Sequence, residues 1–493
     1  MSGGLAVQPE RVQRLSVRPE RSGAYVLYWM QQSQRAEDNH ALEYAIAEAN
    51  HRGLPLLVAF GLTDGYPEAN LRHYRFMLEG LRETEAALRE RQIRFVLRRG
   101  SPDQVALELA HDAALLVCDR GYTRLQRLWR ATVAAEAQCP VVQVESDLVV
   151  PVEVPAEKAE YGAHTLRLRL QRLLPTYLQP LPALSLLRSS RDLPVEGESL
   201  ADLDSFLARL ELDRTVPPVT HFFRGGASAA RRELHSLVSS LRDYAVNRGR
   251  PESGHVSHLS MYLHFGQISS LAVALAVSAA VEAPEEDRAN FLEELIVRRE
   301  LCHNWVHFTP EYDDYRSLPR WARETLAAHA ADARHPGYTE AELERADTHD
   351  PYWNASMREM RYTGYMHNKM RMYWGKKILE WSPSPEEAFR RTLRLNNRYF
   401  LDGRDPNSYA GVAWIFGQHD RPWGERPIYG KIRCMVASGL ERKSDIRAYV
   451  AWVDRRVEEA RAASIRFPDE AERATPRMAP GAARGTASLF PEA

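Results

Sequence analysis

The sequence predicts two domains of different class, an α/β domain with a doubly wound parallel sheet followed by an all-α domain. Its 493 residues are more than one hydrophobic core usually organises. Short apolar runs alternate with amphipathic stretches in the first third, whereas nearly every later segment has the helical period. The expected boundaries are a loose N-terminus at 1–22, an α/β domain at 23–175, a linker at 176–201, a helical domain at 202–466 and a disordered tail at 467–493.

Five apolar runs predict the strands of the α/β domain. They read AYVLYWM, LPLLVAF, IRFVL, ALLVCD and VVQVE, beginning at Ala24, Leu54, Ile93, Ala114 and Val141. Amphipathic stretches such as 40–50 and 74–90 separate them, which indicates βαβ units in a sheet covered on both faces. Such sheets bind ligands beyond the carboxyl ends of their strands. Neither the GxGxxG nor the P-loop pattern occurs here, so we expect this domain to have no chemistry of its own.

Prolines mark the linker, because proline cannot continue a helix or a central strand. They are Pro175, Pro180, Pro182 and Pro194. The residues from 467 onward are rich in Ala, Pro, Gly and Arg, a composition typical of disorder.

The net charge of −1 does not by itself suggest a nucleic-acid partner, although only one face of a large protein need be basic. Two segments, 358–377 and 421–443, are strongly basic. Either alone is as consistent with a solvated helix face as with function, but the pair favours a surface that faces phosphates. Four scattered cysteines without a CxxC pair indicate a reducing compartment. The N-terminus lacks the apolar core of a secretory signal, and no apolar run is long enough to span a bilayer.

The most informative stretch is 362–414, which begins YTGYMHNKMRMYWGKKILEW and ends LNNRYFLDGRDPNSYAGVAW. Trp374 and Trp381 lie seven residues apart, so they share one face of a predicted helix. Spacing alone favours ordinary core packing for them. Cations interleave with these aromatics and a DGRDPN turn follows, an arrangement suited to redox chemistry beside a polyanion.

This stretch resembles the flavin-binding half of DNA photolyases, and its residue pattern is most similar to that of the class II cyclobutane-pyrimidine-dimer photolyases. The segment GHVSHLSMYLHFGQIS at 254–269 is similar to the family segment that holds the flavin pyrophosphate. The resemblance covers most of the chain, most strongly 240–445. It implies a deoxyribodipyrimidine photo-lyase, an enzyme that repairs cyclobutane dimers in DNA by light-driven electron transfer from reduced FAD to a flipped-out dimer.

The resemblance implies a set of cofactor-binding residues: Tyr244, Ser257, Leu259, Ser260, Arg371, Asp402, Asp405 and Asn407. Ser257 and Ser260 would face the pyrophosphate, where hydroxyls join free backbone N–H groups. Arg371 would pair with Asp402 beside the isoalloxazine and stabilise its anionic reduced state. Asn396 and Asn407 are both candidates for the amide that faces flavin N5, and the family pattern favours Asn396. The histidines of 254–269 lack further ligands at suitable spacing, so no metal site is expected.

Catalytic and substrate roles follow from the same resemblance. Glu300, in the segment RREL, would face the dimer, and Trp374, Trp353 and Trp381 would carry electrons to the flavin. Trp305 is either core or cavity wall, and we favour the wall. The residues expected to contact the lesion or the DNA are Trp305, Asn368, Lys369, Met372, Trp414, Arg421, Trp423, Lys431 and Arg433. Arg421 and Trp423 combine a phosphate-neutralising cation with an aromatic wedge.

Rival interpretations stay open at this point. A cryptochrome-like photoreceptor would keep FAD and the tryptophans without repair. A (6-4) photolyase would want a histidine at the lesion, and His367 lies in the motif. A nucleotide-binding α/β protein with a helical partner-binding domain would be colourless. An antenna chromophore, whether a deazaflavin, a folate or another flavin, is an open expectation for the first domain.

The expected partner is double-stranded DNA that contains pyrimidine dimers. We expect the protein to be a monomer and to make no membrane contact. The tail ends TASLFPEA, and Ser488, Leu489 and Phe490 resemble peptides that bind bacterial sliding clamps. A tail without a partner is the simpler interpretation. We expect a cytoplasmic protein, associated with the nucleoid if its source is bacterial.

Overall fold

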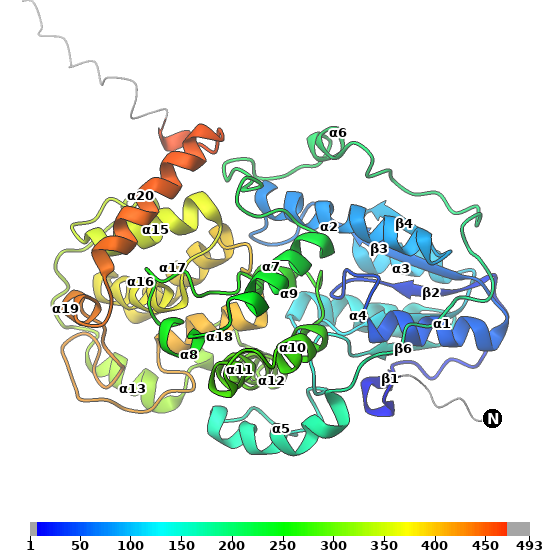
Figure 1. Ribbon diagram of the computed structural model, residues 1–493, viewed down its shortest axis with the longest axis horizontal. Coiled ribbons are helices and arrows are strands. Elements are labelled where there is room, and N and C mark those ends of the chain that lie inside the picture. The colour runs from blue at the N-terminus through cyan, green and yellow to red at the C-terminus, as the bar shows by residue number, and fades with distance from the viewer. Residues whose placement is uncertain (1–6, 471–493) are drawn as a thin grey trace, which may run out of the picture.

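A six-stranded sheet forms the N-terminal part of the computed structural model, which describes residues 7–470 (Figure 1). The strands are β1 (Val12–Arg14), β2 (Tyr25–Trp29), β3 (Leu56–Leu62), β4 (Arg94–Arg99), β5 (Ala113–Asp119) and β6 (Val141–Val144), in the order β1-β6-β5-β2-β3-β4. All neighbours are parallel except β1, which pairs antiparallel with β6. Because β2, β3, β5 and β6 are buried along their whole length, they read as continuous apolar runs. The predicted α/β class is confirmed.

Helices cover both faces of this sheet. One face packs against α1 (His40–Arg52) and α2 (Leu71–Glu90), and the other against α3 (Pro102–Ala110) and α4 (Arg124–Glu136). Local chemistry sets the ends of α1: the Asn39 side chain accepts hydrogen bonds from the backbone N–H groups of Ala41 and Leu42, and Gly53 closes the helix with φ 63°. The sheet is therefore doubly wound, as the alternating pattern predicts.

The N-terminus differs from the loose segment expected at 1–22. Residues Pro9–Arg11 form a short 3₁₀ turn, η1, that leads into β1. The buried Arg11 guanidinium donates hydrogen bonds to the carbonyl oxygens of Glu145, Leu148 and Val149 at 3.3, 3.0 and 2.5 Å. A polar segment is ordered here by partners more than 130 residues away, which local composition does not reveal.

The rest of the described chain is helical. Its helices are α5 (Ala163–Tyr177), α6 (Leu203–Ala208), α7 (Ala227–Ser239), α8 (Tyr244–Asn247), α9 (Ser260–His264), α10 (Ser270–Ala279), α11 (Glu285–Leu292), the π-helix η2 (Glu293–Arg298), α12 (Arg299–Phe308), the 3₁₀ turn η3 (Tyr315–Ser317), α13 (Arg320–Ala328), α14 (Glu340–Glu344), α15 (Pro351–Thr363), α16 (Asn368–Trp381), α17 (Pro385–Tyr399), α18 (Pro406–Ile415), α19 (Ala437–Glu441) and α20 (Ile446–Ala462). The helix-rich second half confirms the predicted class.

The connection between the halves contains no regular element from 178 to 202. It runs beside β4, where the backbone N–H of Glu198 donates to the Leu97 carbonyl at 2.8 Å. Two buried contacts then tie the halves together. Arg72 on α2 donates to the Tyr399 carbonyl at 2.7 Å, and Arg299 on α12 donates to Asp147, which follows β6, at 2.8 Å. The sheet is thus held in a fixed position against the helices that form the larger site.

The described chain ends in packed structure. Phe467, at the start of the expected disordered tail, is buried against Tyr362 and lies 4.2 Å from the Arg361 guanidinium carbon. Residues 467–470 are therefore ordered, unlike the disorder expected from 467 onward. The predicted clamp-binding residues 488–490 lie outside the described residues.

Candidate functional site

A cavity of about 350 Å³ opens among the helices of the second half. Its walls come from α8, α9, α11, η2, α12, α16, α17 and α18, together with the loops before α9 and α16. All eight predicted cofactor-binding residues line it, and so does Asn396. Segments far apart in the sequence therefore meet at one site, as the resemblance implies.

A cation–carboxylate pair lies in the wall of this cavity. Arg371 on α16 contacts Asp402 through two parallel pairs of atoms, Nη1 to Oδ1 and Nη2 to Oδ2, each at 3.0 Å. The guanidinium carbon lies 3.9 Å from the centroid of the Phe400 ring, and Nε donates to the Met366 carbonyl. The Nη2–Oδ2 contact is a hydrogen bond and the Nη1–Oδ1 contact is ionic, and together with the stacking they restrict the orientation of the guanidinium. The wall thus presents a rigid positive group with a partner carboxylate.

Amides and hydroxyls lie close to this pair. The Asn396 amide donates to Ser408 Oγ at 2.9 Å and to Asn397 Oδ1 at 3.0 Å, so its side chain is held in place. Asn407 donates instead to Asp405, its own N-cap neighbour, at 2.8 Å. Ser260 is the first residue of α9, and Ser257 lies in the loop before it. Tyr244 packs on Phe291, and burial raises its pKa to about 12.

Asp405 begins α18 as its N-cap, where Oδ1 accepts the backbone N–H of Asn407 at 2.7 Å. Its Oδ2 lies 3.2 Å from His264 Nδ1. Burial alone would raise the pKa of this carboxyl, but the His264 contact and the nearby Arg299 outweigh burial and lower it. Asp405 is therefore a stable carboxylate in the cavity wall.

Three tryptophans lead away from the cavity. Trp374 forms part of the wall, and its backbone carbonyl accepts a hydrogen bond from Trp353 Nε1 at 2.9 Å. Trp353 and Trp381 are in edge contact, with ring centroids 5.5 Å apart. Trp381 in turn contacts the partly exposed Tyr338. The structure thus brings the three predicted tryptophans into one continuous series.

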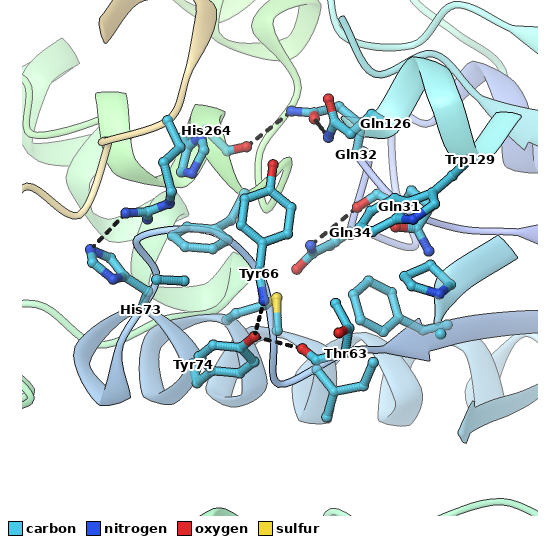
Figure 2. Close-up of a pocket in the computed structure, with 18 residues that line it drawn as sticks. Gln31, Gln32, Gln34, Thr63, Tyr66, His73, Tyr74, Gln126, Trp129 and His264 are labelled. Carbon is cyan, nitrogen blue, oxygen red and sulfur yellow. Dashed lines mark hydrogen bonds between the residues drawn. The ribbon is translucent and has the colours of Figure 1, made fainter. Parts of the chain in front are cut away.

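A second, smaller cavity of about 100 Å³ lies between the sheet and the helical half (Figure 2). It opens beyond the carboxyl ends of β2 and β3, where parallel sheets bind ligands. Figure 2 shows Gln31, Gln34 and Trp129 on one side of it, and His73 and His264 on the other. Gln126 donates to Gln32 at 2.8 Å, so amide groups form much of the polar lining. Sequence reasoning named no residue here, although the polar run that follows the first strand was a usable signal.

Comparison with known proteins identifies the family. The chain is 48% identical to the deoxyribodipyrimidine photo-lyase of Methanothermobacter thermautotrophicus over 90% of this chain and 98% of that protein. The chain belongs to the DNA photolyase family. The family model described as DNA photolyase matches residues 26–185, and the deoxyribodipyrimidine photo-lyase of Arabidopsis thaliana is 37% identical over 92% of this chain and 94% of the relative. The predicted photolyase resemblance is confirmed.

Solved photolyase structures share the fold. A class III photolyase from Agrobacterium tumefaciens superimposes with a TM-score of 0.70 at 18% identity, covering 93% of each chain. A Synechocystis cryptochrome superimposes with a TM-score of 0.67 at 14% identity, covering 87% of this chain and 89% of the cryptochrome. Within residues 7–470 of this photolyase-family chain, none of the helices has the length and apolar character needed to cross a bilayer.

Two predicted site residues lie elsewhere in this photolyase-family chain. Glu300 is buried away from both cavities, where Oε1 accepts backbone N–H groups from Val149 at 2.9 Å and Val150 at 3.2 Å. Burial raises the pKa of this carboxyl to about 8. Trp305 is core as well, packed near His419. The substrate-facing roles predicted for these two residues are wrong.

The π-helix η2 explains this difference. Its wider turn changes which residues face the cavity, so that the lining positions are Glu294, Leu295, Arg298, Arg299 and Cys302. Glu300 points from another face of α12 toward Val149 and Val150, and Trp305 lies beyond Cys302, the last residue of this helix that lines the cavity. Glu294, not Glu300, is the glutamate that lines the cavity, and it pairs with Arg248. The sequence-based prediction did not include Glu294, Arg248 or Arg298. The adjacent acidic pair at 293–294 was a usable signal for Glu294, and no local pattern marks the two arginines.

The predicted lesion contacts divide between the cavity and the surface. Asn368, Met372 and Trp414 line the cavity. Lys369 lies outside the lining and donates to Ser444 Oγ at 2.6 Å. On the surface, the exposed Trp423 ring lies between two guanidinium groups, 5.3 Å from that of Arg421 and 5.0 Å from that of Arg433. The backbone N–H of Trp423 donates to the carbonyl of the exposed Lys431 at 2.9 Å.

Proposed function

We propose that this chain is a light-dependent deoxyribodipyrimidine photo-lyase that repairs cyclobutane pyrimidine dimers in DNA. The observation that carries the proposal is one cavity with three parts: the Arg371–Asp402 pair, the series of tryptophans behind Trp374, and the Trp414 side. The pair and the Trp414 side suit a flavin enzyme that receives an extruded base, and the tryptophans suit photoreduction of its flavin. The high identity to relatives named deoxyribodipyrimidine photo-lyase, over most of both chains, supports the same function.

The residues of the large cavity fit FAD. Trp374 Nε1 and His258 Nδ1 are buried polar atoms in its wall that have no hydrogen-bond partner within residues 7–470. Buried polar groups without partners are rare in proteins, and a polar ligand here would satisfy them. Tyr244, Ser257, Leu259 and Ser260 would hold the phosphate end, and Arg371 with Asp402 the ring end. When bound, reduced FAD supplies the light-driven electron.

The protein contributes position and charge. Arg371 would place a cation beside the ring, where it would stabilise negative charge, and Asp402 would keep that cation oriented. The Asn396 amide, held by Ser408 and Asn397, would face flavin N5, as the family pattern implies. The series Trp374, Trp353 and Trp381 would serve photoreduction of oxidised flavin and have no part in dimer splitting.

The dimer would enter from the side of the cavity formed by Asn368, Met372 and Trp414. Glu294 is the carboxylate available there as a hydrogen-bond acceptor for pyrimidine N–H groups. Outside the cavity, Arg421, Lys431 and Arg433 would bind backbone phosphates, and Trp423 would fill the space left by the extruded nucleotides. Lys369 would extend this rim. We also propose a monomeric cytoplasmic protein that acts on double-stranded DNA.

The small cavity is the proposed site of an antenna chromophore. Its amides and aromatic side chains suit a flat, uncharged ring system, such as a deazaflavin, a folate or a second flavin. His264 lines this cavity and contacts Asp405, which lines the large one, so a single pair of side chains separates the two sites. A short separation suits energy transfer to the flavin.

The decisive experiment uses the purified full-length protein, a duplex with a single thymine dimer, and blue light. The proposal expects a flavin spectrum and light-dependent restoration of the two thymines, with none in the dark. A protein that carries flavin but restores no dimers would reject repair and favour a cryptochrome-like photoreceptor. Colourless protein would reject flavin chemistry altogether.

A further inference from the structure

Arg298 is the last residue of η2, and its side chain lines the large cavity beside Trp414. The guanidinium carbon lies 5.6 Å from the centroid of the Trp414 ring. A guanidinium at this distance is attracted to an indole ring, most strongly where water is partly excluded. The Arg298 side chain is 35% exposed, so it is neither buried core nor free in solvent.

Arg298 differs from the other arginines of the cavity in its hydrogen bonding. Arg248 pairs with Glu294, Arg299 with Asp147, and Arg371 with Asp402. Within residues 7–470, Arg298 Nη1 and Nη2 have no hydrogen-bond acceptor, and Nε is buried without one. The donors of this one cavity arginine are therefore available to a ligand.

The nearest carboxylate does not satisfy Arg298. Glu293 Oε1 lies 3.5 Å from Arg298 Nε, which is an ionic contact without a hydrogen bond. Glu293 already accepts two hydrogen bonds from Arg167 on α5, at 2.9 and 2.6 Å. Arg167 thus orients Glu293 and neutralises most of its attraction for Arg298. The result is a cation with spare donors, positioned over an aromatic ring.

We propose that Arg298 contacts the damaged dinucleotide and determines selectivity for it over undamaged DNA. The inference rests on the proposed repair function and adds a residue to it. The Trp414 ring offers an apolar surface to the extruded pyrimidines, while the Arg298 fork donates to an oxygen of the same dinucleotide. That oxygen belongs to a pyrimidine carbonyl or to the phosphate between the two pyrimidines. An undamaged duplex leaves its bases stacked and never reaches this cation.

The test is a binding measurement with Arg298→Gln, made in the dark on flavin-loaded protein. Hydrogen bonds to charged groups contribute about 1.5–3 kcal/mol, so affinity for a duplex with one thymine dimer should fall by about tenfold or more. Affinity for the undamaged duplex should change by less than about twofold, because Arg298 does not reach it. Arg169→Gln is the control, since it removes an exposed cation from α5 without touching Glu293 or the cavity. It should leave the ratio of the two affinities unchanged.

Two further arms make the outcome decisive. Arg298→Lys keeps the positive charge and loses the two-pronged guanidinium donor. The ratio of affinities for damaged and undamaged duplex should therefore fall by only about threefold. A loss as large as that of Arg298→Gln would show that the charge has no role of its own. A methylphosphonate between the two pyrimidines locates the acceptor. If the phosphate is the partner, the difference between wild type and R298Q disappears on this substrate, and if a carbonyl is the partner, the difference remains. The proposal is overturned if R298Q binds the dimer-containing duplex as tightly as wild type. It is also overturned if R298Q loses affinity for the damaged and the undamaged duplex by the same factor. Because binding is measured in the dark, failure of repair and failure of this inference are distinguishable.

Discussion

The two cavities of this chain differ in the charge of the residues that line them. The large cavity has four arginines and the carboxylates Glu294, Asp402 and Asp405 in its wall. The small cavity is lined mainly by amides, aromatic rings and apolar groups, with Arg404 as its arginine. Charged walls stabilise a ligand that carries or gains charge, whereas amides and rings position a neutral one. The difference supports our proposal that electron chemistry takes place in the large cavity and light collection in the small one.

The largest expected effect follows from Asp402→Asn, which leaves Arg371 without its anionic partner. The guanidinium then loses the contact that orients it toward the flavin, and because a hydrogen bond to a charged group contributes up to about 3 kcal/mol, FAD should bind up to about a hundredfold more weakly. The measurement is flavin absorbance per protein after gel filtration. Asp213→Asn, which breaks the Arg398 pair away from both cavities, is the control and should keep its flavin. Full flavin in D402N would refute the assignment of charge chemistry to the large cavity.

Trp374→Phe should interrupt the tryptophan series at the cavity wall. Photoreduction of oxidised flavin should slow by about tenfold or more, because the protein no longer provides a redox-active ring at that position. Repair by chemically reduced enzyme should be unchanged. Trp129→Phe, in the small cavity, should photoreduce like wild type, and equal slowing in both variants would contradict the separation of roles. Flash spectroscopy at flavin wavelengths makes the comparison.

Trp129→Ala should affect the small cavity alone. Trp129 lines it in edge contact with Tyr66, at 6.1 Å between ring centroids. Loss of an aromatic contact weakens binding of a flat ligand by about three- to tenfold. The check is titration of a deazaflavin or a folate into wild type and variant, together with the action spectrum of repair. An unchanged chromophore affinity would remove the small cavity from light collection, and a loss of FAD would show that the cavities are not independent.

The smallest expected effect concerns Glu300, which joins α12 to the segment after β6. Its ordinary pKa of 4.5 is raised to about 8 in the folded protein by burial. Because the folded-state pKa is the higher one, the protonated form favours folding, and that stabilisation is lost as the pH rises from 4.5 to 8. Glu300→Gln stays neutral, so its melting temperature relative to wild type should rise by a few degrees between pH 5 and pH 8.

A repair assay distinguishes the role of Glu300 from that of Glu294. Glu300→Gln should repair dimers normally, since Glu300 lies outside both cavities, whereas Glu294→Gln should lose repair and keep the pH dependence of stability seen in wild type. The reverse pattern would restore the role that the sequence assigned to Glu300.

Much of the site was predictable where a local pattern and a spatial role coincide. Arg371 and Asp402 lie in one recognisable stretch, and the structure places them 3.0 Å apart. The residues of 257–260 mark the start of α9, and they line the same cavity. Glu300 lies outside both cavities because the π-turn before α12 changes which positions face the ligand, and Trp305 lies outside them because the cavity ends before it along α12. An average period of 3.6 residues cannot reveal such a turn.

The amino-acid sequence by itself determined the order of elements, the sheet class and the position of the aromatic stretch, because apolar periodicity and end-capping residues act over a few neighbours. Only the tertiary structure decided which charges are paired. Arg11 is buried against carbonyls across the sheet, Glu300 binds backbone amides 150 residues away, and Arg298 keeps free donors because Arg167 occupies Glu293. Such pairings depend on distances set by packing between remote segments, and no local pattern encodes them.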